Sequence, residues 1–220
     1  MQNASSPKQS AATPSRRRRV TGLAAAAVLA VFGVAAIGQG LNGQSTVRDA
    51  LKLEGVTGAP HMTPAGIAAN VKKAGLKGID LPTCSVAGKP IDDGTSARCF
   101  AQYMRIDALV VTGGKTYAQL PPFASKDGKG TYDMKAAVKM PDGGPMNNPM
   151  SQTWVTETAL TTALNTSYMA EQISLFGIAV GAAFLLVGLA FGAVALRGVR
   201  VARPSLAIAR RRRPASVEIG

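Results

Sequence analysis

The sequence predicts a mainly α-helical fold, in which two transmembrane helices bracket a small, disulfide-containing helical domain outside the cytoplasm. Three observations lead to this fold: two apolar blocks without charge, an excess of basic residues beside them, and a single pair of cysteines between them. They divide the chain into a basic tail, a membrane segment, an outer domain, a second membrane segment and a second basic tail. The expected bounds are 1–19, 20–38, 39–173, 174–196 and 197–220.

The first apolar block, residues 20–38, contains no charged residue. As an α-helix it would be about 28 Å long, just enough to span a hydrocarbon core of about 30 Å. Much of the block is Ala and Gly, and the small residues Ala36 and Gly38 precede Gln39 as they would at a signal-peptide cleavage site. A retained anchor and a cleaved signal are therefore alternatives, and both place the central region outside the cytoplasm.

The second apolar block, residues 174–196, has 23 uncharged residues, twelve of which are Leu, Ile, Val or Phe. Four of its glycines form two GxxxG patterns and lie within about 60° of one another on a helix. Such a stripe allows close approach of another membrane helix, although Gly is also common in Ala/Gly-rich membrane segments. The partner could be the first segment, a second copy or another protein. The four positions are Gly177, Gly181, Gly188 and Gly192.

The positive charge predicts the orientation of the chain. The formal charge is +13, yet residues 39–173 hold 13 basic and 11 acidic residues, so most of the excess lies in the two tails. By the positive-inside rule both termini are expected in the cytoplasm, where basic residues contact anionic lipid headgroups. Nucleic-acid binding is not expected, because these basic runs carry no aromatic residues and form no folded basic face. The residues that determine the orientation are Arg16, Arg17, Arg18, Arg19, Arg197, Arg200 and Arg203.

Cys84 and Cys99 are the only cysteines, and both lie in the expected outer domain. An even number of cysteines in an oxidising compartment predicts a disulfide. It would stabilise the fold by about 3 kcal/mol, because it restricts the conformations of the unfolded chain. A metal pair or two free thiols are the alternatives. Zinc would need two further ligands, and the chain has one histidine and no CxxC.

The sequence predicts helices in the outer domain. Thr63 and Pro64 form a cap and a first helical position, which predicts a helix from 65 to 74. A second helix is expected from about Thr95 to Thr112, ended by Gly113-Gly114. A short helix around 46–53 is also expected.

The region from 121 to 150 has scattered Pro, Gly and Asp, which favours an extended, partly mobile excursion. From about Ser151 the helical pattern returns, and no breaker separates it from the second membrane segment. One long helix is therefore expected to leave the bilayer and continue into the outer domain. Tyr168 is close enough to the boundary to act as an interfacial aromatic residue.

Several motifs are rejected as sites. Gly113-Gly114-Lys115-Thr116 resembles the end of a phosphate-binding loop but closes a helix and lacks the earlier glycine. His61, the single histidine, is interpreted as a surface residue beside the Thr63 cap, which leaves no Ser-His-Asp or HExxH arrangement. Asp92-Asp93 before Gly94 is interpreted as a turn or cap.

No cofactor is expected. Several methionines offer a copper(I) site as the minor alternative, because thioether ligands suit that ion. The favoured interpretation of these methionines is an adaptable contact surface. The methionines concerned are Met134, Met140, Met146 and Met150, with Met62 elsewhere.

The cysteine region, with Leu81-Pro82-Thr83-Cys84 and Ala97-Arg98-Cys99-Phe100-Ala101, and the stretch 161–172 resemble small two-pass membrane proteins of actinobacteria of unknown function. The resemblance covers roughly residues 45–196 and carries over no functional residue. Some proteins of this kind are labelled aromatic ring-opening dioxygenase. That activity does not fit this chain. Non-haem iron oxygenases bind their iron with two histidines and a carboxylate, and this chain has only one histidine.

The sequence does not identify a biochemical activity. The leading hypothesis is a non-enzymatic cell-envelope subunit that binds partner proteins through its outer domain and membrane helices, with a membrane-protein partner or a second copy beside the glycine stripe. The alternative is a cell-envelope enzyme with a site that spacing does not reveal, or, less favoured, an extracytoplasmic metal-binding protein.

Overall fold

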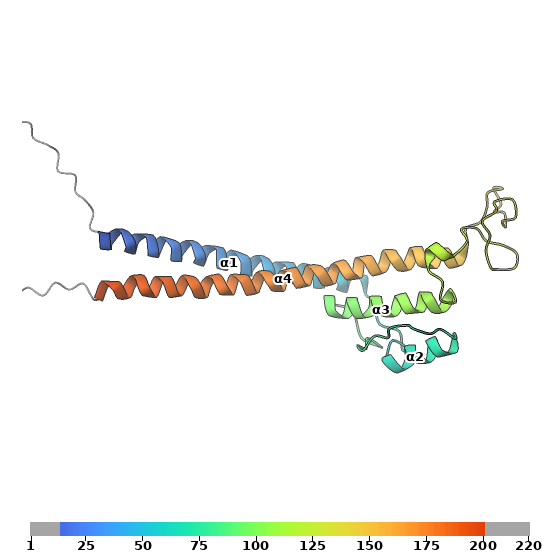
Figure 1. Ribbon diagram of the computed structural model, residues 1–220, viewed down its shortest axis with the longest axis horizontal. Coiled ribbons are helices and arrows are strands. Elements are labelled where there is room, and N and C mark those ends of the chain that lie inside the picture. Colours follow the sequence, from blue (N-terminus) through green and yellow to red (C-terminus); the bar gives the residue numbers. More distant parts are fainter. Residues whose placement is uncertain (1–13, 201–220) are drawn as a thin grey trace, which may run out of the picture. The chain divides into compact units, whose positions relative to one another are not determined.

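The computed structural model describes residues 14–200. These residues form a mainly helical protein, as the sequence predicts, and within the described range there is no β-strand, only isolated bridges. The described residues divide into two compact units, one of residues 14–35 with 181–200 and one of residues 36–180. The elements, labelled in Figure 1, are α1 (Pro14–Glu54), α2 (Pro64–Lys73), α3 (Gly94–Val111), the short 3₁₀ helix η1 (Tyr117–Gln119) and α4 (Pro149–Arg200).

Helix α1 does not stop at residue 38: the residues of the short helix expected around 46–53 are helical, but they are the last part of α1. The helix runs without a break from Pro14 to Glu54. Two glycines beyond residue 38 are packing positions: a Cβ on Gly40 would lie 2.6 Å from the carbonyl oxygen of Ser174, and one on Gly43 would meet the Ser174 hydroxyl. Close approach to α4 thus offsets the cost of about 1 kcal/mol that a helical glycine carries.

Helix α4 confirms the predicted continuous helix. It extends over 52 residues from Pro149, two positions before the expected start. Pro149 suits the first turn, where its missing N–H costs nothing. The preceding Asn148 is 1% exposed: its Oδ1 accepts a hydrogen bond from the backbone N–H of Met150, and its amide nitrogen donates to the carbonyl oxygen of Pro121 at 2.8 Å.

Both long helices are long and apolar enough to cross a membrane, by length and composition. In the most apolar 18-residue stretch of each helix, only 6% and 11% of the stretch is buried within the protein. The core helix of a soluble domain would be mostly buried. In the unit formed by 14–35 and 181–200 they pack through small residues. A Cβ on Gly33 would lie 2.7 Å from the carbonyl oxygen of Gly181, and a Cβ on Gly188 would lie 3.1 Å from that of Ala26.

The core of the unit 36–180 is formed by α2, α3, the loop that joins them and the last turns of α1; α2 and α3 are labelled in Figure 1. Its most buried side chains are Tyr103, Ile67 and Ile91. The predicted disulfide is confirmed: Cys84 in the loop is bonded to Cys99 in α3, with the Cα atoms 6.2 Å apart. The hydroxyl of Tyr103 donates a 2.7 Å hydrogen bond to the carbonyl oxygen of Cys84, and burial raises the pKa of this phenol.

The predicted helix ends are confirmed. The Thr63 hydroxyl accepts a 3.0 Å hydrogen bond from the N–H of Gly66 at the start of α2. Asp93 is the N-cap of α3, where it accepts from the N–H of Ser96 at 2.6 Å while the Ser96 hydroxyl reaches back to its backbone, a capping box. At the other end of α3, Gly113 and Gly114 have positive φ angles of 63° and 82°, which favour glycine.

Glu171 of α4 joins three helices. Its side chain is 6% exposed; Oε2 accepts a 2.6 Å hydrogen bond from the N–H of Gly94, and Oε1 pairs with the guanidinium of Arg48 at 3.0 Å. One turn earlier, the Tyr168 ring lies 4.6 Å from the guanidinium carbon of Arg98. The aromatic ring that the sequence places at a membrane interface is thus engaged with α3.

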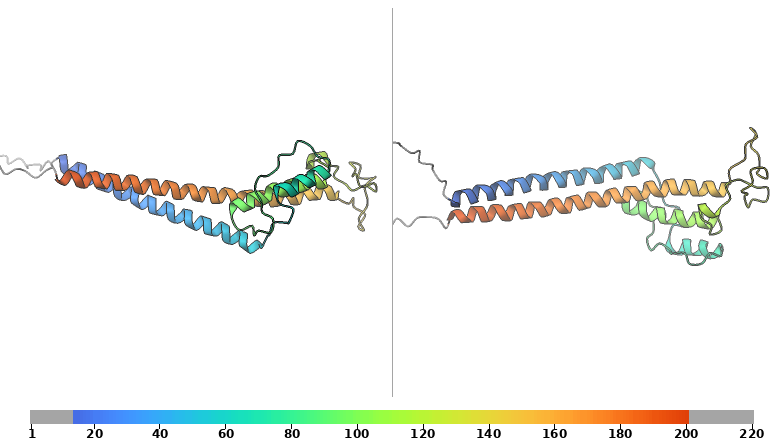
Figure 2. Two further views of the ribbon diagram at one scale, coloured as in Figure 1. Left: turned by 90° about the horizontal axis from the view of Figure 1, so that it is seen from below. Right: turned by 45° about the horizontal axis from the view of Figure 1, so that its top comes forward.

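The region from 121 to 147 has no regular element but is tied together by backbone hydrogen bonds, and both views of Figure 2 show it gathered beside the first turn of α4. Phe123 bridges both Thr131 and Asn147. The extended backbone expected here is therefore folded on itself. The pKa of Asp127 lies below its usual value, mainly because the Ser125 hydroxyl donates to its carboxylate.

Candidate functional site

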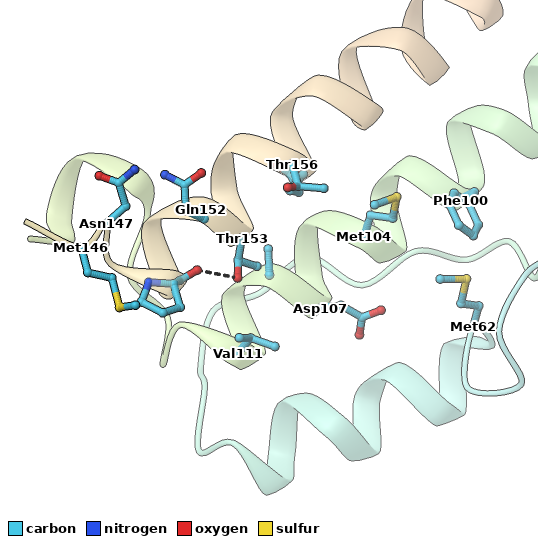
Figure 3. A pocket seen from close by; sticks show the side chains of 13 residues that line it. Met62, Phe100, Met104, Asp107, Val111, Met146, Asn147, Gln152, Thr153 and Thr156 are labelled. Carbon is cyan, nitrogen blue, oxygen red and sulfur yellow. Dashed lines mark hydrogen bonds between the residues drawn. The ribbon is translucent and has the colours of Figure 1, made fainter. Parts of the chain in front are cut away.

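A cavity of about 750 Å³ opens between α3, α4 and the loop before α2. Figure 3 shows Phe100, Met104 and Asp107 projecting from α3, with Met62 facing them from that loop. On the α4 side the cavity is bounded by hydroxyl and amide side chains, and by the buried Glu157. The residues that α4 and its preceding loop contribute are Met146, Asn147, Pro149, Gln152, Thr153, Thr156 and Glu157.

A second cavity, of about 510 Å³, adjoins the first. Phe100 and Met104 line both cavities, so these two side chains form the shared floor. The last two turns of α1 close the far end. We call the two cavities together the α3–α4 groove. The further residues of the second cavity are Ala50, Leu51, Glu54, Val56, Ile91, Leu160, Ala163, Leu164 and Ser167.

Helical periodicity explains why these residues share a groove. Along α3 the lining positions are 100, 104, 107, 108 and 111, and along α4 they are 149, 152, 153, 156, 157, 160, 163, 164 and 167. Steps of three and four residues keep side chains on one face of a helix. Each helix therefore presents one continuous stripe to the groove. In α3 this stripe lies beside the core stripe that holds Cys99, Tyr103 and Ile106.

The charges in the groove are all acidic. Its lining contains Glu54, Asp107 and Glu157 and no Lys or Arg, although the chain as a whole is strongly basic. Glu157 is 4% exposed. In the described part of the chain its carboxylate accepts one hydrogen bond, from the Thr158 hydroxyl at 3.3 Å. Among the described residues no fully buried side-chain oxygen lacks a hydrogen-bond partner, so the Glu157 oxygen that accepts no bond stays accessible to solvent.

Asp107 has a stronger partner. Its Oδ2 lies 2.9 Å from Nε2 of His61, and both side chains are about one-third exposed. The expectation that His61 is a surface residue beside the Thr63 cap therefore misses its contact, because only the folded chain brings the loop before α2 against α3. The pair leaves His61 bound to a carboxylate at the edge of the groove.

The predicted packing glycines lie on the side of α4 that faces α1. Gly181 and Gly188 face Gly33 and Ala26 as described above, and a Cβ on Gly192 would lie 3.8 Å from the Cβ of Ala26. In the other unit, a Cβ on Gly177 would lie 3.7 Å from the carbonyl oxygen of Ala36. Their role in association with a further protein stays a prediction.

Of the arginines expected to set the orientation, Arg17, Arg18, Arg19 and Arg197 lie in the described helices. Arg203 lies outside the described residues, as do the side chains of Arg16 and Arg200.

The methionines considered for copper are spread over different surroundings. Met146 lines the groove together with Met62, whereas Met150 packs against the small cluster of Ala108, Leu120 and Trp154. Met134 and Met140 are 55% and 39% exposed and line neither cavity.

The groove residues that sequence reasoning missed are Phe100, Met104 and Glu157. The available signal was the width of the apolar arc on α3: Phe100 and Met104 follow Cys99 and Tyr103 by one position each, so α3 is apolar on two adjacent stripes, and one of them faces the core.

Comparison of the chain with known protein families, with curated proteins and with solved structures finds no match.

Proposed function

We propose that this protein is a two-pass subunit of the cell membrane, with both termini in the cytoplasm, and that residues 39–173 form an extracytoplasmic module that binds partner proteins without catalysis. The observation that carries the proposal is the α3–α4 groove. Its floor and most of its walls are apolar, as in binding sites that recognise shape and apolar surface.

The orientation is supported by the distribution of charge. Most of the excess of positive charge lies on the two tails, beside helices that are able to span a membrane. A disulfide between Cys84 and Cys99 fits an oxidising compartment. Contacts of Ala26 and Gly33 with α4 support retention of the first segment as an anchor rather than its removal as a signal.

Two measurements on native cells test the proposal. A membrane-impermeant amine reagent applied to intact cells should modify the lysines between 126 and 139, and modification of Lys8 should require permeabilisation. Labelling of Lys8 alone in intact cells contradicts the orientation. Intact-protein mass should include residues 20–38; a mature N-terminus at Gln39 contradicts the two-pass form.

The binding role is tested by crosslinking in native membranes, followed by purification and mass spectrometry. A partner protein recovered in constant ratio with the chain is the expected result. Crosslinkers are placed at positions throughout residues 39–173. If none of them captures another protein, the role of a partner-binding subunit is contradicted.

A further inference from the structure

We infer that the α3–α4 groove receives an amphipathic helix of the partner protein, and that a Lys or Arg on the apolar side of this helix pairs with Glu157. The inference rests on the proposed function and adds to it the site and the chemistry of the partner segment.

The length of the groove favours a helix. On α4 the lining extends from Pro149 to Ser167, which at 1.5 Å per residue is about 27 Å along the helix axis. A compact small molecule would fill part of such a site, whereas a helix of about 18 residues matches its whole length. Binding of an amphipathic helix in a groove between two helices is a recurring mode of peptide recognition.

The surface of the groove suits apolar anchors. Phe100 and Met104 are partly exposed on its floor, and Leu160 and Val111 on its walls are 46% and 60% exposed. Aromatic and methionine side chains are enriched at the centre of protein interfaces, and methionine adapts to the shape of the side chain that packs against it. A second helix would remove this apolar surface from water.

The charge of the groove specifies what else the helix carries. Glu157 is buried with a single hydrogen bond at 3.3 Å, and Asp107 and Glu54 lie on either side of the shared floor. An acidic segment would meet three like charges and no Lys or Arg in the lining. A segment with a basic residue near its centre would instead give the Glu157 carboxylate the charged donor that it lacks among the described residues.

The experiment places a photoreactive phenylalanine analogue at single positions of the full chain in native membranes. Val111 and Leu160 are the groove positions; Tyr117 and Tyr132, which are 56% and 69% exposed and line neither cavity, are the matched controls. The expected result is an adduct from the two groove positions and none from the controls. Mass spectrometry should place the adduct in an amphipathic helix with Lys or Arg on its apolar side.

Glu157→Gln tests the charge with little change of shape, and Asp49→Asn removes an exposed carboxylate outside both cavities as its control. Loss of one partner of a desolvated charge pair should reduce the adduct yield about tenfold or more, while Asp49→Asn should leave it unchanged. A cooperative thermal unfolding transition in detergent micelles shows that each variant is folded.

The outcomes separate the two proposals. Adducts only from positions outside the groove overturn the groove as the site but leave a partner-binding subunit in place. A groove adduct to an acidic or non-helical segment, or an equal yield from Glu157→Gln, overturns the chemistry inferred here. Absence of an adduct from every position overturns the proposed function itself.

Discussion

The backbone N–H of Gly94 donates a 2.6 Å hydrogen bond to Oε2 of Glu171, a residue 77 positions away in the chain. The bond attaches the first turn of α3 to α4, and a side chain at position 94 would not fit, because its Cβ would lie 2.8 Å from the Cα of Tyr168. Glu171 thus holds the end of α3 while it also pairs with Arg48 of α1.

Glu171→Gln should lower the free energy of unfolding by about 2–4 kcal/mol, because the change removes a buried charge that accepts hydrogen bonds from two elements. Thermal unfolding in detergent micelles measures the effect. Glu54→Gln is the matched control, since Glu54 is exposed and has no hydrogen bond or ion pair in the described part of the chain. Equal unfolding temperatures for the two variants contradict the role given to Glu171.

Replacement of both Cys84 and Cys99 by Ala should destabilise the unit 36–180 by about 3 kcal/mol, because the bond closes a loop between positions 15 residues apart. The same thermal measurement applies. Alkylation of the denatured wild-type protein without reductant should add no alkyl group, and two groups after reduction. A gain of two groups without reductant would show that the thiols are free.

Gly188→Leu should weaken the packing of α1 against α4 by about 1–3 kcal/mol, because its Cβ would already lie 3.1 Å from the carbonyl oxygen of Ala26. The readout is a disulfide between Gly22→Cys and Ala195→Cys, whose Cβ atoms would lie 3.3 Å apart. Gly38→Leu is the control, since a Cβ there meets nothing within 4 Å. The crosslink should form in the control and be reduced in Gly188→Leu; equal yields reject the packing role.

Tyr103 should titrate above its ordinary pKa of 10.0, because burial disfavours the phenolate. A pKa that is higher in the folded state than in the unfolded chain stabilises the fold fully below the unfolded value. That contribution is lost as the pH rises through the folded pKa. Unfolding temperature should therefore fall in this alkaline range, and by less in Tyr103→Phe, which also loses about 1 kcal/mol with its bond to Cys84. The same alkaline slope in both proteins contradicts the assignment.

Local chemistry explains which elements could be predicted from the sequence. Thr63 and Asp93 cap α2 and α3 with their own side chains, and Gly113 ends α3 through its positive φ angle. These signals depend only on neighbouring residues. The disulfide was predictable for a different reason, because the chain offers only one pair of cysteines.

The features that sequence reasoning missed depend on residues distant in the chain. Gly40 and Gly43 lie beyond the first apolar block, and their close approach to Ser174 exists only in the folded chain. His61 has no visible partner until the folded chain brings Asp107 within 2.9 Å. The groove requires two stripes, on α3 and α4, to face one another, and neither stripe shows by itself that the space between them is unfilled.

Trp154 is the only tryptophan of the chain, and its surroundings give the protein an intrinsic fluorescent reporter. The indole is 3% exposed, its Nε1 donates to the carbonyl oxygen of Lys115 at 2.8 Å, and its ring lies 5.5 Å from the guanidinium carbon of Arg105. It packs with Ala108, which lines the groove. Occupation of the groove can therefore be followed through the emission of this indole in the unlabelled protein, because the chain has no second tryptophan whose emission would overlap with it.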